Sequence, residues 1–282
     1  MNRAIIIHCF AVIFAAAAHK AAAVTVTQDN DATNLAAALA PSPGSGVTVT
    51  GVFTEASNVQ MLGNFTGGNS TIGFSDGIVL STGNVTQIAF PASGLDTGFA
   101  GSPTSNSTLD LINSIPTVAG SFHDTVRLSL TIDPGLLNNY VNFSLGFLSN
   151  EISESDRFGV FLDDTYFGFL SGSPISMSHP WIFASVSNIG FASALYLDGD
   201  GTNPESFLVS IAIPSPGVSF TLDFVLVDVF GDSVDTAVFL GNLTLSETPL
   251  GVVMIPEPGT LGLLALAGSS LLLLRRRRAA NV

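Results

Sequence analysis

Hydrophobic and polar residues alternate with a period of two along much of the chain. The clearest stretches are residues 126–132, 141–147 and 220–226, in which every second residue is Val, Ile, Leu or Phe. Successive side chains of a strand point to opposite faces, so this alternation predicts strands that are buried on one face. Shorter apolar runs predict further strands at residues 77–80, 158–162, 207–213 and 237–245.

Helical signals are few. Asp31 is placed to cap a short helix that ends before Pro41, and residues 107–113 form a second candidate helix. Many short strands with so little helix predict an all-β fold, an antiparallel β-sandwich of the jelly-roll type with one or two short helices. Its core is expected to hold one large residue from each of four apolar sets: Leu130, Phe143, Phe224 and Phe239.

The composition agrees with a folded β-domain. Hydrophobic residues make up 46% and charged residues 11%, which excludes a disordered chain, and 21 Phe with 28 Gly and 14 Pro are typical of short strands joined by tight turns. Residues 24–255 contain 21 of the 22 acidic residues but only two basic ones, Arg127 and Arg157. A domain this acidic repels phosphate backbones, so nucleic acids are excluded as partners.

The first 23 residues have the order of a secretory signal peptide: a basic residue, an apolar run and then Ala21-Ala22-Ala23. We expect a signal helix that is removed before Val24, and an uncleaved membrane anchor is the alternative. The only cysteine of the chain, Cys9, lies in this segment. The exported chain then has no thiol, which excludes disulfides, cysteine catalysis and zinc-thiolate sites.

The C-terminal segment has three parts in a fixed order: Pro256, Glu257 and Pro258, then an apolar run at residues 261–274, then Arg275, Arg276, Arg277 and Arg278. The apolar run, extended by the residues before it, predicts a transmembrane helix, and the arginines hold its end in the cytoplasm. We expect residues 249–255 to be a linker, residues 256–278 to be the signal, and residues 279–282 to be a cytoplasmic tail.

This order resembles the PEP-CTERM sorting signal of Gram-negative bacteria that make exopolysaccharide. The resemblance implies that an exosortase-type membrane protease cleaves the chain near residues 256–258. It also implies that the protein is exported, is transiently anchored in the inner membrane, and then reaches the cell surface or extracellular matrix. A plain single-span anchor that is never cut is the alternative.

Five segments of the expected domain, residues 24–248, carry a second resemblance. They are GIVLSTG at 77–83, HDTV at 123–126, FLSNE at 147–151, DRFGVFL at 156–162, and the aspartate-rich stretch at 228–239. Their order resembles the choice-of-anchor L domain, with two departures: Asn150-Glu151-Ile152 in place of a paired Glu-Glu-Tyr, and Asp235-Thr236-Ala237 in place of Asp-Ser-Ala. The family name records only that such domains occur with different surface anchors, so it implies no activity.

Catalytic signals are weak. His123 and His179 are the only histidines after the signal peptide, neither has a partner at metal-binding spacing, and no Gly-x-Ser-x-Gly motif occurs. We therefore predict that the protein is not an enzyme. Pairs of carboxylates are abundant, however, which leaves a glycan-acting enzyme open.

Acidic residues cluster where strands are expected to end. Glu151 and Asp228 follow two predicted strands, while Asp156 and Asp235 precede two others. Ca²⁺ takes about six to eight oxygen ligands from carboxylates, carbonyls and water, which suits a chain rich in Asp and Gly. These four residues are therefore the predicted calcium site, and a solvated acidic rim is the alternative.

Together these features predict an exported surface protein with a structural or adhesive role in the envelope or exopolysaccharide matrix. Its partners would be extracellular polysaccharide or other matrix proteins. The alternative is a carbohydrate-binding module or a glycan-acting enzyme at the cell surface. That alternative needs aromatic rings exposed on one sheet face, for which the candidates are Tyr140, Tyr166, Trp181 and Tyr196.

Overall fold

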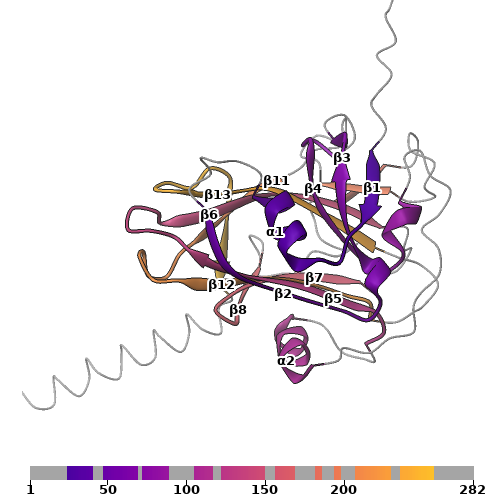
Figure 1. Cartoon of the computed structure of the whole chain (residues 1–282), viewed down its shortest axis with the longest axis horizontal. Coiled ribbons are helices and arrows are strands. Elements are labelled where there is room, and N and C mark those ends of the chain that lie inside the picture. Colours follow the sequence, from indigo (N-terminus) through magenta and orange to yellow (C-terminus); the bar gives the residue numbers. More distant parts are fainter. Residues whose placement is uncertain are drawn as a thin grey trace, which may run out of the picture.

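The computed structural model describes residues 24–40, 47–68, 72–88, 105–116, 122–149, 156–168, 182–185, 194–197, 207–229 and 236–256. Their strands form two layers, drawn one above the other in Figure 1. The upper sheet contains, in order across it, β1 (Thr25–Gln28), β3 (Leu62–Thr66), β4 (Asp76–Ser81), β13 (Thr236–Ser246), β6 (Tyr140–Ser149) and β11 (Phe207–Ala212). The lower sheet contains β8 (Thr165–Gly168), β7 (Arg157–Leu162), β12 (Phe220–Val227), β5 (Thr125–Asp133) and β2 (Thr48–Ala56).

Neighbouring strands within each of these two sheets are antiparallel. A further antiparallel pair, β9 (Ile182–Ser185) with β10 (Ala194–Leu197), forms a separate two-stranded sheet, and its strand β10 lies near β6. The predicted all-β fold with antiparallel sheets is therefore confirmed in the part of the chain that the structure describes. The jelly-roll detail stays a prediction, and the expected signal helix and transmembrane helix lie outside these residues.

One strand joins the two layers. β14 (Val252–Pro256) pairs in parallel with β11 through Val252 to Met254, and antiparallel with β8 through Ile255 and Pro256. The expectation that residues 249–255 form a linker is wrong for this part, because the apolar run Val-Val-Met-Ile has the composition of a strand and both neighbouring strands leave an edge open to it. We call β14 the seam strand.

Two short α-helices lie where sequence signals predict them. α1 (Ala32–Leu39) is capped by Asp31, whose carboxylate accepts hydrogen bonds from the Thr33 and Asn34 N–H groups. It lies between the layers, with Leu35 and Leu39 fully buried. α2 (Asn106–Ser114), capped by Ser105, lies beneath the lower sheet (Figure 1). Two 3₁₀ turns, η1 (Val59–Met61) and η3 (Val85–Gln87), are also present.

The core between the sheets contains three of the four predicted residues. Leu130, Phe143, Phe224 and Phe239 are each at most 1% exposed. Phe143 of the upper sheet meets Phe224 of the lower sheet edge to face, with ring centroids 5.0 Å apart. The predicted inward direction is therefore confirmed for Leu130, Phe143 and Phe224. It is wrong for Phe239, which packs against Phe65 on the outer face of the upper sheet, while its neighbours Val238 and Leu240 face the core between the sheets. A second apolar cluster covers that outer face, so both faces of β13 are buried.

The expectation that the strands are buried on one face only is wrong. The outward residues Arg127, Asn142 and Asp223 are at most 8% exposed. On the lower sheet the reason is α2, which adds a second apolar layer outside it that packs on Phe161, Tyr166 and Val225. A polar residue beneath such a cover must be paired within the protein, because water no longer reaches it.

No helix in the described ranges is both long enough and apolar enough to span a membrane. Of the predicted sorting signal, Pro256 is the last described residue and ends the seam strand. Glu257, Pro258 and Arg275 to Arg278 lie outside the described residues.

Candidate functional site

Motif segments that are far apart in the sequence meet at one end of the sandwich. Thr82 follows β4, Asp124 precedes β5, Asp156 precedes β7, Asp228 follows β12, and Thr236 begins β13. We call these five residues the motif end. It is the end at which β5 and β7 begin and β12 stops, opposite to the turn between β5 and β6.

Three carboxylates lie side by side in the strand register. Val227 pairs with Thr125 on one side and with Arg157 on the other, so the next residue, Asp228, is flanked by Asp124 and Asp156. The Asp228 N–H donates to the Asp124 carbonyl at 2.8 Å. All three aspartates are at most 2% exposed. Carboxylates buried this deeply require polar partners or a counter-charge.

Thr82 ties the upper sheet to this row. Its hydroxyl donates to Asp156 Oδ2 at 3.1 Å and accepts from the Thr236 N–H at 2.9 Å. Its own N–H donates to the Thr236 carbonyl at 3.0 Å. A Thr in the LSTG turn therefore bridges the two sheets through one hydroxyl, which gives that motif a physical role.

A cation lies next to the row. Arg157, one of the two basic residues in residues 24–255, is 7% exposed and donates from Nη1 to the Asp156 carbonyl at 3.0 Å. The Asp156 carbonyl therefore holds this guanidinium at the motif end.

The structure describes two of the four predicted calcium ligands. Asp156 and Asp228 do reach the same end, whereas Glu151 and Asp235 lie outside the described residues. Asp124 was not among the predicted ligands, although its position just before a predicted strand is a signal that could have identified it. Within the described ranges no three acidic or histidine side chains form a group that could hold a metal ion. A calcium site at this end therefore requires side chains from outside those ranges.

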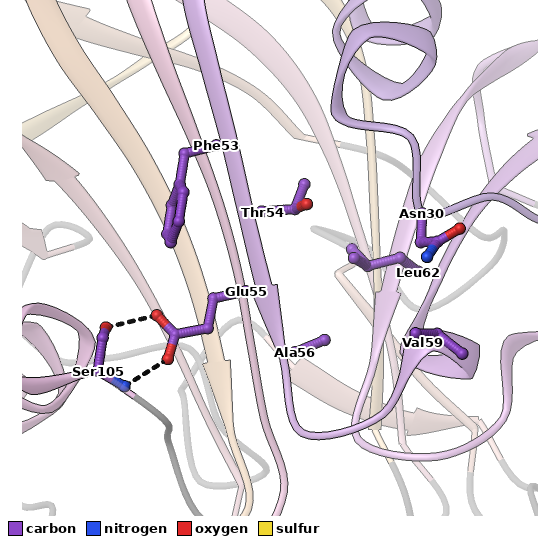
Figure 2. A pocket seen from close by; sticks show the side chains of 8 residues that line it. All are labelled: Asn30, Phe53, Thr54, Glu55, Ala56, Val59, Leu62 and Ser105. Carbon is purple, nitrogen blue, oxygen red and sulfur yellow. Dashed lines mark hydrogen bonds between the residues drawn. The ribbon is translucent and has the colours of Figure 1, made fainter.

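A second candidate lies beside β2, where a hollow of about 400 Å³ wraps the strand (Figure 2). Phe53 and Glu55 point to one side of the strand, and Thr54 and Ala56 point to the other, toward Leu62. Phe53 is 48% exposed, a large fraction for an aromatic ring. The other residues that line the hollow are Asn30, Val59 and Ser105.

One polar residue that lines this hollow, Glu55, is hydrogen-bonded to the start of α2. Glu55 accepts hydrogen bonds from the Ser105 N–H at 2.6 Å and from the Ser105 and Thr108 hydroxyls at 2.5 Å each. The first helical turn thus receives a carboxylate from the sheet, at the end where the helix dipole favours negative charge. Both carboxylate oxygens of Glu55 are therefore used in holding α2 against the sheet.

Arg127 continues the network under α2. It donates to the Ser107 and Thr108 hydroxyls at 3.2 Å each and pairs with Asp223 at 2.8 Å. Its guanidinium also lies 5.5 Å from the centre of the Phe53 ring. Burial raises the pKa of the Asp223 carboxyl above its usual range, against the opposing effects of the Ser129 hydrogen bond and of Arg127.

The aromatic and histidine residues named in the sequence analysis differ in burial and in whether the structure describes them. Tyr166 is buried against Phe161, so it offers no exposed ring, and Tyr140 is half-buried. The backbone N–H of His123 donates to the Asp228 carbonyl at 3.0 Å at the motif end. Trp181, His179 and the side chain of Tyr196 lie outside what the structure describes.

A family model described as the choice-of-anchor L domain matches residues 24–178. No curated protein matches the chain. Among solved structures, a carbohydrate-binding module described as recognising mannan, TmCBM27, is 10% identical, with 78% of this chain and 94% of that chain covered and a TM-score of 0.33. A tailspike protein domain of bacteriophage CBA120 is 13% identical, with 71% and 19% covered and a TM-score of 0.25. These scores are too low to support an argument.

Proposed function

Because the chain belongs to the choice-of-anchor L domain family, whose name refers to surface anchors, we propose that it is a structural or adhesive component of the cell envelope or exopolysaccharide matrix. In this proposal a signal peptide exports the chain, the C-terminal segment holds it transiently in the inner membrane, and an exosortase-type protease then releases it to the surface. Its partners are polysaccharide or other matrix proteins.

One observation supports this proposal above the others. The folded domain continues up to Pro256, the first residue of the Pro-Glu-Pro motif, through a strand that is paired with both sheets. The domain and the sorting signal therefore adjoin without a spacer. A protease that cuts near this motif would release the sandwich with its seam strand intact.

A non-enzymatic role agrees with the burial of the motif end. Its three aspartates are 0%, 2% and 1% exposed, for Asp124, Asp156 and Asp228 in that order. General acid or base catalysis requires a carboxylate within hydrogen-bonding reach of the substrate. The burial of these side chains supports a role in the fold rather than in a reaction.

We retain calcium as part of the proposal. Asp156 and Asp228 would contribute carboxylates at the motif end, and Glu151 and Asp235 would supply the remaining ones from adjoining segments. The donor set is all oxygen, which fits Ca²⁺ rather than a transition metal. An ion there would balance the charge of the aspartate row and stabilise the folded state.

Sorting is tested by replacing Arg275 to Arg278 with glutamine. Loss of the cytoplasmic charge is expected to leave the protein uncut and mislocalised, as measured by surface fractionation and mass spectrometry. Serine in place of Ala279 and Ala280 is the matched control, since it changes the same tail without changing its charge. Retention of residues 261–274 in the wild-type surface form would rule out cleavage.

The hollow beside β2 favours a second candidate function, carbohydrate binding. Sugars stack on exposed aromatic rings, and Phe53, which lines the hollow, is 48% exposed. A glycan array with wild type and Phe53→Ala tests this, with Val218→Ala as an exposed control outside the hollow. Binding that is unaffected by Phe53→Ala would exclude the hollow as the site.

A further inference from the structure

Exposed apolar side chains gather at the end of the sandwich opposite the motif end. Leu136 is 84% exposed, Leu137 is 73% exposed and Val218 is 59% exposed, which are high values for side chains of this size. The first two lie on the turn between β5 and β6, and Val218 lies on the turn between β11 and β12. We call these three residues the apolar tip.

The two turns of the apolar tip touch each other. A Cβ atom on Gly217, whose φ is +81°, would lie 2.7 Å from Leu136 Cδ2, so the leucine packs directly against the glycine backbone. The β5–β6 turn is held by the Gly135 N–H, which donates to Asp133 Oδ1 at 3.0 Å. The apolar tip is therefore one built surface that presents its side chains outward.

The seam strand leaves the domain at this same end. β14 runs parallel to β11, with Val252 beside Val209 and Met254 beside Ile211, and β11 leads into the turn that carries Val218. Its last residue, Pro256, pairs with Phe167, which is close to the β7–β8 turn. That turn is bonded to Thr221 at the start of β12, at the apolar tip end.

Chain length then limits how far the tip is from the C-terminal apolar run. Leu261 is five residues beyond Pro256. A fully extended chain spans at most about 3.6 Å per residue, so the two residues are no more than roughly 18 Å apart. A bilayer that holds residues 261–274 must therefore lie within that reach of the seam strand's end.

We propose that the apolar tip docks on the surface of the bilayer that holds the C-terminal segment, with Leu136, Leu137 and Val218 entering the lipid interface. This inference rests on the membrane anchoring in the proposed function. The occupant is a zwitterionic phospholipid surface, because Asp133, Asp163, Asp164 and Glu247 are all exposed at this end and would be repelled by anionic headgroups. The motif end then faces away from the membrane.

The test uses the full chain with Cys9→Ser and one introduced cysteine that carries a fluorophore. The protein is placed in phosphatidylcholine vesicles whose acyl chains carry bromine quenchers. The label positions are Leu137→Cys at the tip, Ala265→Cys in the apolar run, and Val59→Cys as the control. Val59 is 55% exposed, nearly as much as Val218, but follows β2 at the motif end.

Quenching at positions 137 and 265 but not at 59 is the expected result. Quenching at 265 without quenching at 137 would overturn the docking and leave the membrane anchor in place. Absence of quenching at 265 would overturn the anchor and the docking together. Energy transfer between labels at position 137 of different molecules would show instead that the tip faces a second copy, which also overturns the proposal.

Two further measurements probe the chemistry of the contact. With the label at Val218→Cys, the double substitution Leu136→Ser and Leu137→Ser is expected to reduce quenching to the level of the Val59→Cys control. Because these leucines are so exposed, the substitutions leave the core untouched. Adding phosphatidylglycerol is expected to weaken quenching at 137 and not at 265, and a stronger signal at 137 would contradict the apolar contact.

Discussion

A single methyl group tests whether the seam strand closes the sandwich. In Gly251→Ala, the new Cβ atom would lie 1.8 Å from the Leu208 carbonyl oxygen and 2.4 Å from its carbonyl carbon. Both are backbone atoms of β11, so no side chain can rotate away to make room. Residue 251 must instead move by roughly 1 Å or more, which shifts the start of β14.

The cost follows from the bonds on either side of that residue. The N–H groups of Leu250 and Gly251 donate to Ser210 Oγ at 3.0 and 2.9 Å, and the next residue, Val252, begins the ladder with Val209. Each hydrogen bond contributes about 0.5 to 1.5 kcal/mol net, so losing these two and the first ladder pair predicts a loss of about 2 to 4 kcal/mol. In a domain of this size the Tm falls by roughly 5 to 15 °C.

Thermal unfolding of the full chain in mild detergent, followed by circular dichroism, measures this loss. Gly135→Ala is the control: Gly135 has a φ of +62°, but its Cβ would meet nothing within 4 Å. Only the backbone penalty of about 1 kcal/mol applies there. A Gly251→Ala protein as stable as the Gly135→Ala protein would refute the tight packing of residue 251 against β11.

Three other outcomes are expected. Phe224→Ala leaves a cavity beside Phe143 and should cost about 3 to 5 kcal/mol in urea unfolding, and a cost below about 1 kcal/mol would contradict the close packing between the sheets. Burial raises the pKa of Asp223, so the folded protein keeps that proton to a higher pH than the unfolded chain does. The contribution of protonated Asp223 to the stability of the folded state is complete at low pH. It is lost as the pH rises through the folded-state pKa of this carboxyl. Asp223→Asn should therefore flatten the fall in stability above about pH 4, and an unchanged slope in urea midpoints would assign the effect to other groups. Millimolar Ca²⁺ should raise the Tm of wild type but not of Asp228→Asn, whereas a wild-type midpoint unchanged after EDTA stripping would defeat the calcium proposal.

Local patterns in the sequence predicted the elements well. Alternation placed Phe143 and Phe224 in the core, and the N-cap rule placed α1 directly after Asp31. Such signals depend on a residue and its near neighbours along the chain. They carry over to the structure because strand faces and helix starts are set locally.

These local patterns could not predict contacts between residues that lie far apart in the sequence. Periodicity assigns a face to Arg127 but does not reveal that α2 covers that face, so the buried pair with Asp223 was missed. The same limit applies to Asp124, which meets Asp228 only because β5 and β12 are neighbours in the lower sheet. The linker predicted at residues 249–255 is wrong at residues 252–255, because these residues form a strand by pairing with β11 and β8, and that pairing cannot be read from the local sequence.

The seam strand also decides how the domain responds to tension. Any pull on a C-terminal anchor enters the sandwich at Pro256 and therefore loads β14 before the other strands. β14 lies along β11 and β8, so a pull in the direction in which the chain leaves shears both ladders at once. Forced unfolding is governed by the unfolding rate. Detachment of these few pairs therefore sets the load at which an anchored domain yields.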